Sequence, residues 1–347
     1  MKKNLFLLSG ILVLSFSSQA QELKEDYMKW PESPKLGQYV SSWVPGKDLF
    51  EDENFYVSRV KPKERFRNAA TQIDETLTEA NDRKLVFWVP VGNASNGNTN
   101  ARPNGKFDSE AFSTWSYVTH YGDWTAPHGW VPGGFADVAH KNGVGVSGVA
   151  SVPWGGISSE WSSGFSTLVG IEAEKVAKFL HYHGVDGLGY NSEFSTGSSF
   201  ILSGLRALHE TVHKYLTEKG NPVVENFWYD GTNDNGQITF DSGLGNHNNW
   251  HGVLGGLTQS TVDTYAPGRS SLDLYAGFNM QGGDPSTWRT LKDYNLSIGL
   301  WGAHDYNMLW ADRANNGSTD VAKQTYYQHL IEQFFTNGNR NPIDKIE

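Results

Sequence analysis

The chain has 347 residues, 38% hydrophobic and 19% charged, which suffices for one large folded domain and argues against disorder. Its formal net charge of −10 argues against nucleic acid and anionic membranes as partners, since both require a basic surface. The absence of cysteine excludes disulfides, thiolate metal sites and cysteine nucleophiles. An aromatic content of 13%, with 13 Trp, suits the stacking of sugar faces on flat rings. An aromatic-rich core would give the same composition.

The first twenty residues have the pattern of a secretory signal peptide. Lys2 and Lys3 precede a mostly apolar stretch over 5–16, and the small residues Ser18 and Ala20 flank Gln19 before the expected cleavage point. This stretch is short for a membrane span, and no later segment approaches about 18 consecutive apolar residues. We therefore expect an exported protein, periplasmic or secreted, with no membrane span.

The rest of the chain divides into a lead-in over 21–82, which scattered prolines predict to be irregular, and an alternating region over 83–340. Apolar runs predict eight strands, and amphipathic stretches that end at glycine or near the end of the chain predict helices between and after them. The strands are expected over 85–89, 117–121, 144–152, 185–192, 223–229, 251–257, 272–279 and 296–301, and the helices over 132–142, 169–184, 205–220 and 327–334.

About eight strands, most of them separated by helices, predict an α/β fold of the (β/α)8 barrel type. A doubly wound open sheet is the alternative. The barrel is favoured because polar and aromatic residues gather at the expected carboxyl ends of strands, where such barrels place their active sites. These residues are Asn191, Glu193, Tyr229, Asp230, Asn279 and Trp301.

The strand expected over 185–192 carries the most chemical information. Because a strand alternates its faces, Gly187, Gly189, Asn191 and Glu193 belong to one face, and the two glycines leave open space beneath an amide and a carboxylate. Glu193 is therefore a candidate general acid. A carboxylate at a strand end can equally cap the following loop, so residue type alone leaves both interpretations open.

The segment over 186–193 resembles the D-G-x-D-x-D-x-E signature of family 18 chitinases, with Gly189 and Asn191 where acids would stand. Its Asn-x-Glu is similar to glycoside hydrolase family 85, the endo-β-N-acetylglucosaminidases. Residues 139–144 resemble that family's helix and third strand, 226–230 its W-Y-D motif and 275–279 its seventh strand. Residues 252–257 depart from the aromatic run of the family's sixth strand.

The resemblance implies cleavage of the β-1,4 bond in the N,N'-diacetylchitobiose core of N-glycans by a substrate-assisted, retaining mechanism, with transglycosylation onto a sugar acceptor. Glu193 would protonate the leaving oxygen and then deprotonate water. Asn191 would orient the 2-acetamido group, and Tyr229 would hold its carbonyl side. The expected substrate-binding residues are Trp228, Asp230, Tyr121, Trp154, Asn279, Trp301, Phe240 and Trp250.

No cofactor or metal is expected. The G-x-G-x-x-G over 143–148 follows a helix and lies in a strand, which is the wrong context for a dinucleotide loop. His247 and His251 lack an H-E-x-x-H pattern, and His181 and His183 end a helix, where they cap it or lie on its surface. We expect a monomer whose partners are the N-glycans of glycoproteins. The alternatives are a family 18-like chitinase and a secreted glycan-binding protein without catalysis.

Overall fold

The structure is a computed structural model that describes residues 36–47, 57–64, 78, 83–88, 115–123, 133–151, 167–192, 199–230, 244–247, 272, 275–279, 297–301 and 317–331. The expected signal peptide lies outside these residues. Among the helices that are described, none combines the length and apolar character needed to cross a membrane.

Eight parallel strands form a closed barrel in which each strand pairs with its neighbour in chain order. The last strand returns to the first, with Trp301 aligned to Trp88. This closure confirms the (β/α)8 barrel and excludes the open sheet. The strands are β1 (Leu85–Trp88), β2 (His120–Asp123), β3 (Gly145–Ser151), β4 (Leu188–Ser192), β5 (Phe227–Asp230), β6 (Leu244–His247), β7 (Tyr275–Asn279) and β8 (Ser297–Trp301).

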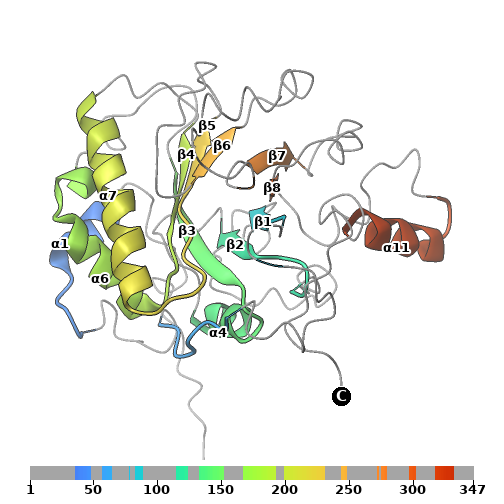
Figure 1. The fold of residues 1–347 in the computed structure, drawn as a ribbon, viewed down its shortest axis with the longest axis horizontal. Helices are drawn as coiled ribbons and strands as arrows, with labels where there is room; N and C mark the ends of the chain where they lie inside the picture. Colours follow the sequence, from blue (N-terminus) through green and yellow to red (C-terminus); the bar gives the residue numbers. More distant parts are fainter. Residues whose placement is uncertain are drawn as a thin grey trace, which may run out of the picture.

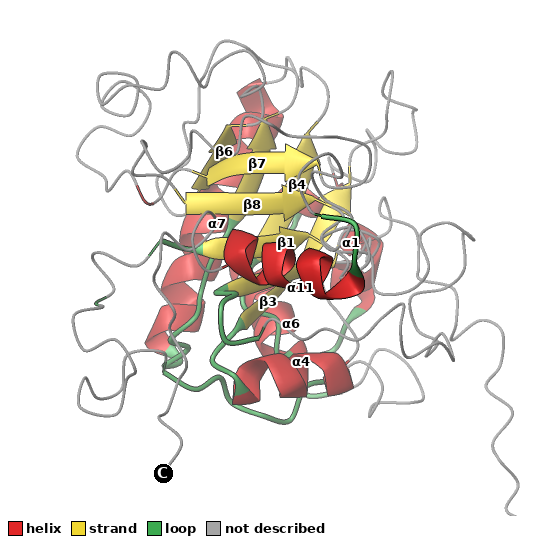
Figure 2. Ribbon diagram, turned by 90° about the vertical axis from the view of Figure 1, so that its right-hand side faces the viewer, coloured by secondary structure: helices red, strands yellow, loops and turns green. Residues whose placement is uncertain are grey.

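Helices cover the outside of this barrel (Figure 1). In that view α1, α6 and α7 stand together beside β3 and β4, α4 lies below them, and α11 lies on the opposite side. Figure 2 shows β7 and β8 in the upper part of the sheet and α4 at its lower edge. The helices are α1 (Leu36–Ser42), α4 (Gly133–Lys141), α6 (Ala173–His183), α7 (Ser199–Glu218) and α11 (Asp320–His329).

The main described hydrophobic core lies where α6 and α7 pack against β4. Phe179 of α6, Val212 of α7 and Leu188 of β4 are all fully buried in it. Burying a side chain of this kind stabilises the fold by about 1.5–3 kcal/mol. Helix α6 ends at Gly184, whose φ of 72° is the left-handed conformation that glycine adopts at helix ends. The sequence prediction of this helix end is confirmed.

Several expected elements differ from the structure. The closing helix, expected over 327–334, is α11 at Asp320–His329, and the strand expected over 223–229 is β5 at Phe227–Asp230. Strand β6 lies at Leu244–His247, whereas the apolar residues of 251–257, now outside the described part, had suggested a later strand. Two of the four β6 residues are Gly and Asn, which are typical of loops, so pattern alone missed it. Strand β2 begins at His120 after a turn. The lead-in, expected to be irregular, contains α1, whose Val40 is buried against α6.

Candidate active site at the carboxyl end of the barrel

The barrel interior holds a neutral aromatic layer made by His120, Phe227 and Tyr275. The rings of His120 and Phe227 have centroids 4.8 Å apart, and those of Phe227 and Tyr275 are 5.5 Å apart. These residues come from β2, β5 and β7, which are not neighbours in the sheet, so the rings meet across the inside of the barrel. Burial lowers the pKa of His120 to about 3, so this imidazole is uncharged at neutral pH.

Asn191 and Tyr229 are aligned Cα partners on the adjacent strands β4 and β5. They follow the pair Gly189–Phe227 by two residues, a step of about 6.6 Å toward the carboxyl end of the barrel. Asn246 of β6 is the next partner of Tyr229 in the same row. The two residues that the sequence analysis assigned to the acetamide are therefore neighbours in the sheet, one layer beyond the aromatic ring of Phe227.

Further expected site residues also occupy the carboxyl ends of strands. Asp230 is aligned with Ser192 and with His247, and Trp228 with Tyr190. On the other side of the barrel, Asn279 of β7 is aligned with Trp301 of β8. The backbone thus brings the predicted residues of β4, β5, β7 and β8 to one rim. Four expected site residues lie outside the described part of the chain: Glu193, Trp154, Phe240 and Trp250.

Tyr121 does not fit the substrate-binding role predicted for it. Its side chain is 2% exposed, and its ring lies 4.4 Å from that of Phe135 in α4 and 6.5 Å from that of Trp115. Tyr121 is aligned with Val146, one residue out of step with the interior His120–Gly145 pair. The tyrosine therefore belongs to the packing between the barrel and α4 and does not act as a sugar platform.

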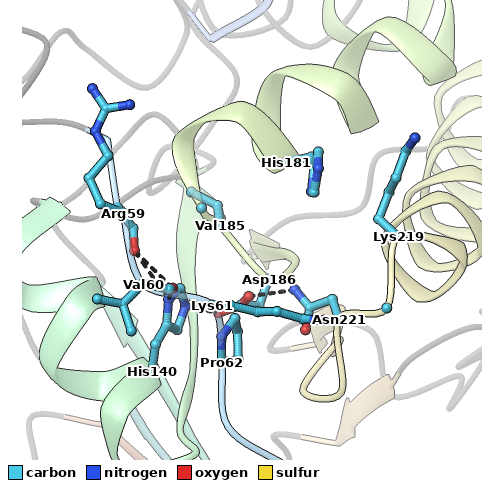
Figure 3. A pocket seen from close by; sticks show the side chains of 13 residues that line it. Arg59, Val60, Lys61, Pro62, His140, His181, Val185, Asp186, Lys219 and Asn221 are labelled. Atoms are coloured by element: carbon cyan, nitrogen blue, oxygen red, sulfur yellow. Dashed lines mark hydrogen bonds and ion pairs between the residues drawn. The ribbon is translucent and has the colours of Figure 1, made fainter.

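The opposite end of the barrel holds a cavity of about 300 Å³ (Figure 3). Its wall includes Lys61, His181, Asp186 and Lys219. Asp186 lies two residues before the first residue of β4. The cavity is therefore at the amino ends of the strands and not beside Asn191. The first acid of the family 18-like signature thus belongs to the amino end of the barrel.

Asp186 is buried, and both of its carboxylate oxygens accept hydrogen bonds. Its Oδ2 accepts hydrogen bonds from His140 Nε2 at 2.8 Å and from the backbone N–H of Val146 at 2.7 Å, and its Oδ1 accepts one from Asn221 Nδ2 at 2.6 Å. A carboxylate with three donors and an exposure of 1% has a structural role. Neither Asp186 nor the cavity beside it resembles a site of proton transfer.

His140 is positively charged in this network. Its Nε2 faces the Asp186 carboxylate, and its Nδ1 lies 2.6 Å from the carbonyl oxygen of Val60. The Ser58 hydroxyl also lies 3.1 Å from Nδ1 but donates to Asp137. The two short contacts of the ring are with oxygens that only accept hydrogen bonds, which favours a proton on each ring nitrogen. Burial opposes this charge, but the charge of Asp186 and its hydrogen bond outweigh burial and raise the pKa of His140. The hydrogen bond from His140 to Val60 ties the segment 57–63, hereafter the strap, to this ion pair.

The described residues contain no group of three or more His, Cys, Asp or Glu that could hold a metal ion. His183, expected to cap α6 or lie on its surface, is instead buried, and its Nδ1 lies 2.8 Å from the carbonyl oxygen of Phe179. Its ring contacts those of Phe179 and Trp43. His183 is therefore a core residue.

Residues 94–252 match the sequence model of glycosyl hydrolase family 85. The resemblance carried by Asn-x-Glu and W-Y-D is thereby confirmed, and with it the enzyme class, a glycoside hydrolase. No curated protein sequence matches the chain.

Among solved structures, the glycoside hydrolase domain of Endo-D from Streptococcus pneumoniae R6 is similar to this chain, with a TM-score of 0.59 and 20% identity. The similarity covers 87% of this chain, which spans 49% of that one, about half its length. A family 18 chitinase of Flavobacterium johnsoniae gives a TM-score of 0.40, 12% identity and coverages of 72% and 94%. A family 18 chitinase domain from the fern Peteris ryukyuensis gives a TM-score of 0.39 and 16% identity, over 72% of this chain and 99% of that one.

Two buried polar residues of the barrel, His120 and Asn226, were not assigned a role from the sequence. His120 gave no signal, because nothing in the chain shows that β2 meets β5 across the barrel. Asn226 lies two residues before the W-Y-D motif, between Glu225 and Phe227. In the structure Asn226 is fully buried and hydrogen-bonded to two other elements.

Proposed function

We propose that this family 85 chain is an exported endo-β-N-acetylglucosaminidase that cleaves the β-1,4 bond of the N,N'-diacetylchitobiose core of N-glycans. The observation that carries the proposal is the alignment of Asn191 with Tyr229 on adjacent strands, at the carboxyl end of a closed barrel. Active sites of such barrels are built at that end. The family match, which includes both residues, supports the same chemistry.

The proposed mechanism uses one enzyme carboxylic acid and a nucleophile from the substrate. Glu193 follows the last residue of β4 in the sequence and supplies the proton to the leaving oxygen. The 2-acetamido oxygen attacks the anomeric carbon, the glycosidic bond breaks, and an oxazolinium ion forms. Glu193 then removes a proton from the water molecule that attacks the anomeric carbon and opens the five-membered ring of the intermediate. Two successive displacements at that carbon retain its configuration. A sugar hydroxyl in place of water gives transglycosylation.

Asn191 and Tyr229 act on the acetamide in this scheme. An amide can accept from the acetamide N–H and so orient the group, and a phenol can donate to or accept from its carbonyl side. Their alignment in one row suits two contacts on one small group. The neutral layer of His120, Phe227 and Tyr275 beneath them adds no charge that would hold a nearby carboxylic acid ionised. A general acid needs its pKa raised toward the working pH, which such surroundings favour.

The proposal is tested by mass analysis of glycans released from high-mannose and complex-type glycoproteins. We expect free glycans that carry one GlcNAc at the reducing end, with one GlcNAc left on the protein. Cleavage of chitin oligomers without glycan release would favour the chitinase alternative. Glycan binding without release would favour the binding protein. Recovery of the mature chain, cut near Ala20, from the periplasm or medium would test export.

A second measurement tests the role of the acetamide. Asn191→Ala is expected to lose hydrolysis of natural glycans, because the acetamide is no longer oriented. The same variant should still transfer a preformed sugar oxazoline to a GlcNAc acceptor, since that substrate has already passed the first step. Equal losses in both reactions would contradict substrate assistance.

A further inference from the structure

We infer that Asn226 is a positioning residue that sets the alignment of Asn191 with Tyr229. The inference rests on the proposed function and deepens it, because it assigns the arrangement of the acetamide-binding pair to a residue outside that pair. Its physical basis is a buried junction between β4 and β5, formed by Gly187, Leu188, Glu225 and Asn226, which lies immediately before the two strands.

The amide of Asn226 connects three elements of the fold. Its Oδ1 accepts a hydrogen bond from the backbone N–H of Leu188 in β4 at 3.0 Å. Its Nδ2 donates one to the carbonyl oxygen of His209 in α7 at 3.2 Å. In a parallel sheet a strand N–H normally finds a main-chain carbonyl on its neighbour, so the side chain of Asn226 replaces a main-chain acceptor at this point.

The backbones leading into β4 and β5 approach each other closely at Gly187. A Cβ at Gly187 would overlap the carbonyl oxygen of Glu225 and lie 3.2 Å from Asn226 Oδ1, so glycine is required for the two chains to approach. The N–H of Glu225 donates to the carbonyl oxygen of Asp186 at 3.1 Å. Asn226 itself is 0% exposed, so water cannot replace its hydrogen bonds at the surface.

The junction acts on the proposed site through the strand register. Leu188 and Asn226 both stand three residues before the aligned pair, Leu188 before Asn191 and Asn226 before Tyr229. A shift of pairing by one residue moves every later side chain to the opposite face of a sheet. Smaller displacements are also costly, because a misplacement of about 1 Å in an active site can reduce the rate by about 10²-fold.

Two substitutions separate this positioning role from packing. Asn226→Leu keeps a similar volume and removes both hydrogen bonds. Asn226→Asp keeps the acceptor for the Leu188 N–H but sets a second oxygen against the His209 carbonyl. Burial raises the pKa of a carboxyl group, and its protonated form can donate to His209 as asparagine does. The aspartate variant should therefore recover as pH falls, and the leucine variant should not.

The experiment measures kcat and KM for glycan hydrolysis across a pH series in wild type, both variants and the matched controls Asn142→Leu and Asn142→Asp. The side chain of Asn142 donates to the carbonyl oxygen of Val138 at the end of α4, and within the described part of the chain it makes no hydrogen bond to β4 or β5. We expect kcat to fall about 10- to 100-fold in Asn226→Leu with KM nearly unchanged. The kcat of Asn226→Asp, relative to wild type, should rise as pH falls, and the controls should match wild type.

Hydrogen exchange of the Leu188 N–H gives a readout that does not depend on activity, and faster exchange in Asn226→Leu is expected. Wild-type kcat in a folded Asn226→Leu would overturn the inference. A loss of kcat in Asn226→Asp that is the same at every pH would also overturn it. This second result does not depend on whether the leucine variant folds. A wild-type chain that exchanges Leu188 slowly yet releases no glycan would instead refute the proposed function.

Discussion

The two ends of the barrel differ in how their polar residues are used. At the amino end, Asp186 accepts three hydrogen bonds and pairs with a charged His140, and both side chains are 1% exposed. At the carboxyl end, Asn191 and Tyr229 are placed side by side by register, beyond a neutral aromatic layer. Charges that are satisfied within the protein stabilise it, whereas the register at the carboxyl end brings together the residues that the proposed function assigns to a ligand. Substitutions of Asp186 and of the residues at the carboxyl end should therefore separate stability from activity.

The largest expected effect lies at the carboxyl end, in Glu193→Gln. Glutamine keeps the shape but has no proton to donate, so glycan hydrolysis should fall by about 10²- to 10⁴-fold while glycan binding is retained. Steady-state rates and direct binding measure the two properties. Glu210→Gln, an exposed site on α7, is the control and should have no effect. Near-wild-type turnover in Glu193→Gln would remove this residue from the mechanism.

At the amino end, Asp186→Asn should reduce the free energy of unfolding by about 3–5 kcal/mol, because it leaves the charge of His140 buried without a counter-charge. The turnover of the folded fraction should stay at the wild-type value. Denaturant unfolding and active-site-normalised rates measure both. A stable Asp186→Asn variant with reduced turnover would contradict the division between the two ends.

Tyr121 tests the boundary between packing and sugar binding. Tyr121→Leu removes ring contacts with Phe135 and Trp115, so it should reduce the free energy of unfolding by about 1–3 kcal/mol. The KM for glycan should not change, because the ring is buried against α4. Thermal unfolding and KM are measured on the same preparation. A raised KM without loss of stability would restore Tyr121 to the substrate-binding set.

The smallest expected effect is a dependence of stability on pH. The pKa of His140 is raised in the folded protein, so its contribution to stability is complete below the unfolded pKa of about 6.5 and is lost as pH rises through the folded value. Over that pH range the free energy of unfolding should fall more steeply in wild type than in His140→Gln. The difference between the two slopes should be at most about 1.4 kcal/mol per pH unit. Parallel pH profiles of the two proteins would show that His140 is not the titrating group.

The fold was largely predictable from sequence because periodic apolar residues report burial directly. The helix end at Gly184 and the strands β1, β3, β7 and β8 follow from such local patterns. Strand β6 did not, since two of its four residues are typical of loops. Barrel closure makes a strand of such residues by supplying hydrogen-bonding neighbours on both sides, and this tertiary effect is invisible in a short window.

The candidate site was predictable only as far as it follows strand order. Asn191 and Tyr229 could be placed at strand ends, and the barrel then aligns them. The pairing of His140 with Asp186 spans 46 positions, and the bond of Asn226 to Leu188 spans 38. Such contacts depend on how separate elements meet, and local propensity contains no information on that. Tyr121 was misassigned for the same reason, because its face of β2 depends on one residue of register.

The strap carries a consequence for how the protein is made. Ser58 donates a hydrogen bond to Asp137, 79 residues later, and the N–H of Ser58 donates to the carbonyl oxygen of His183. A polypeptide that emerges with its amino terminus first cannot form these contacts until the segment carrying α6 has followed. Until then the strap has no surface to dock on, and it remains open to proteases. Its protection should therefore appear no earlier than that of α6.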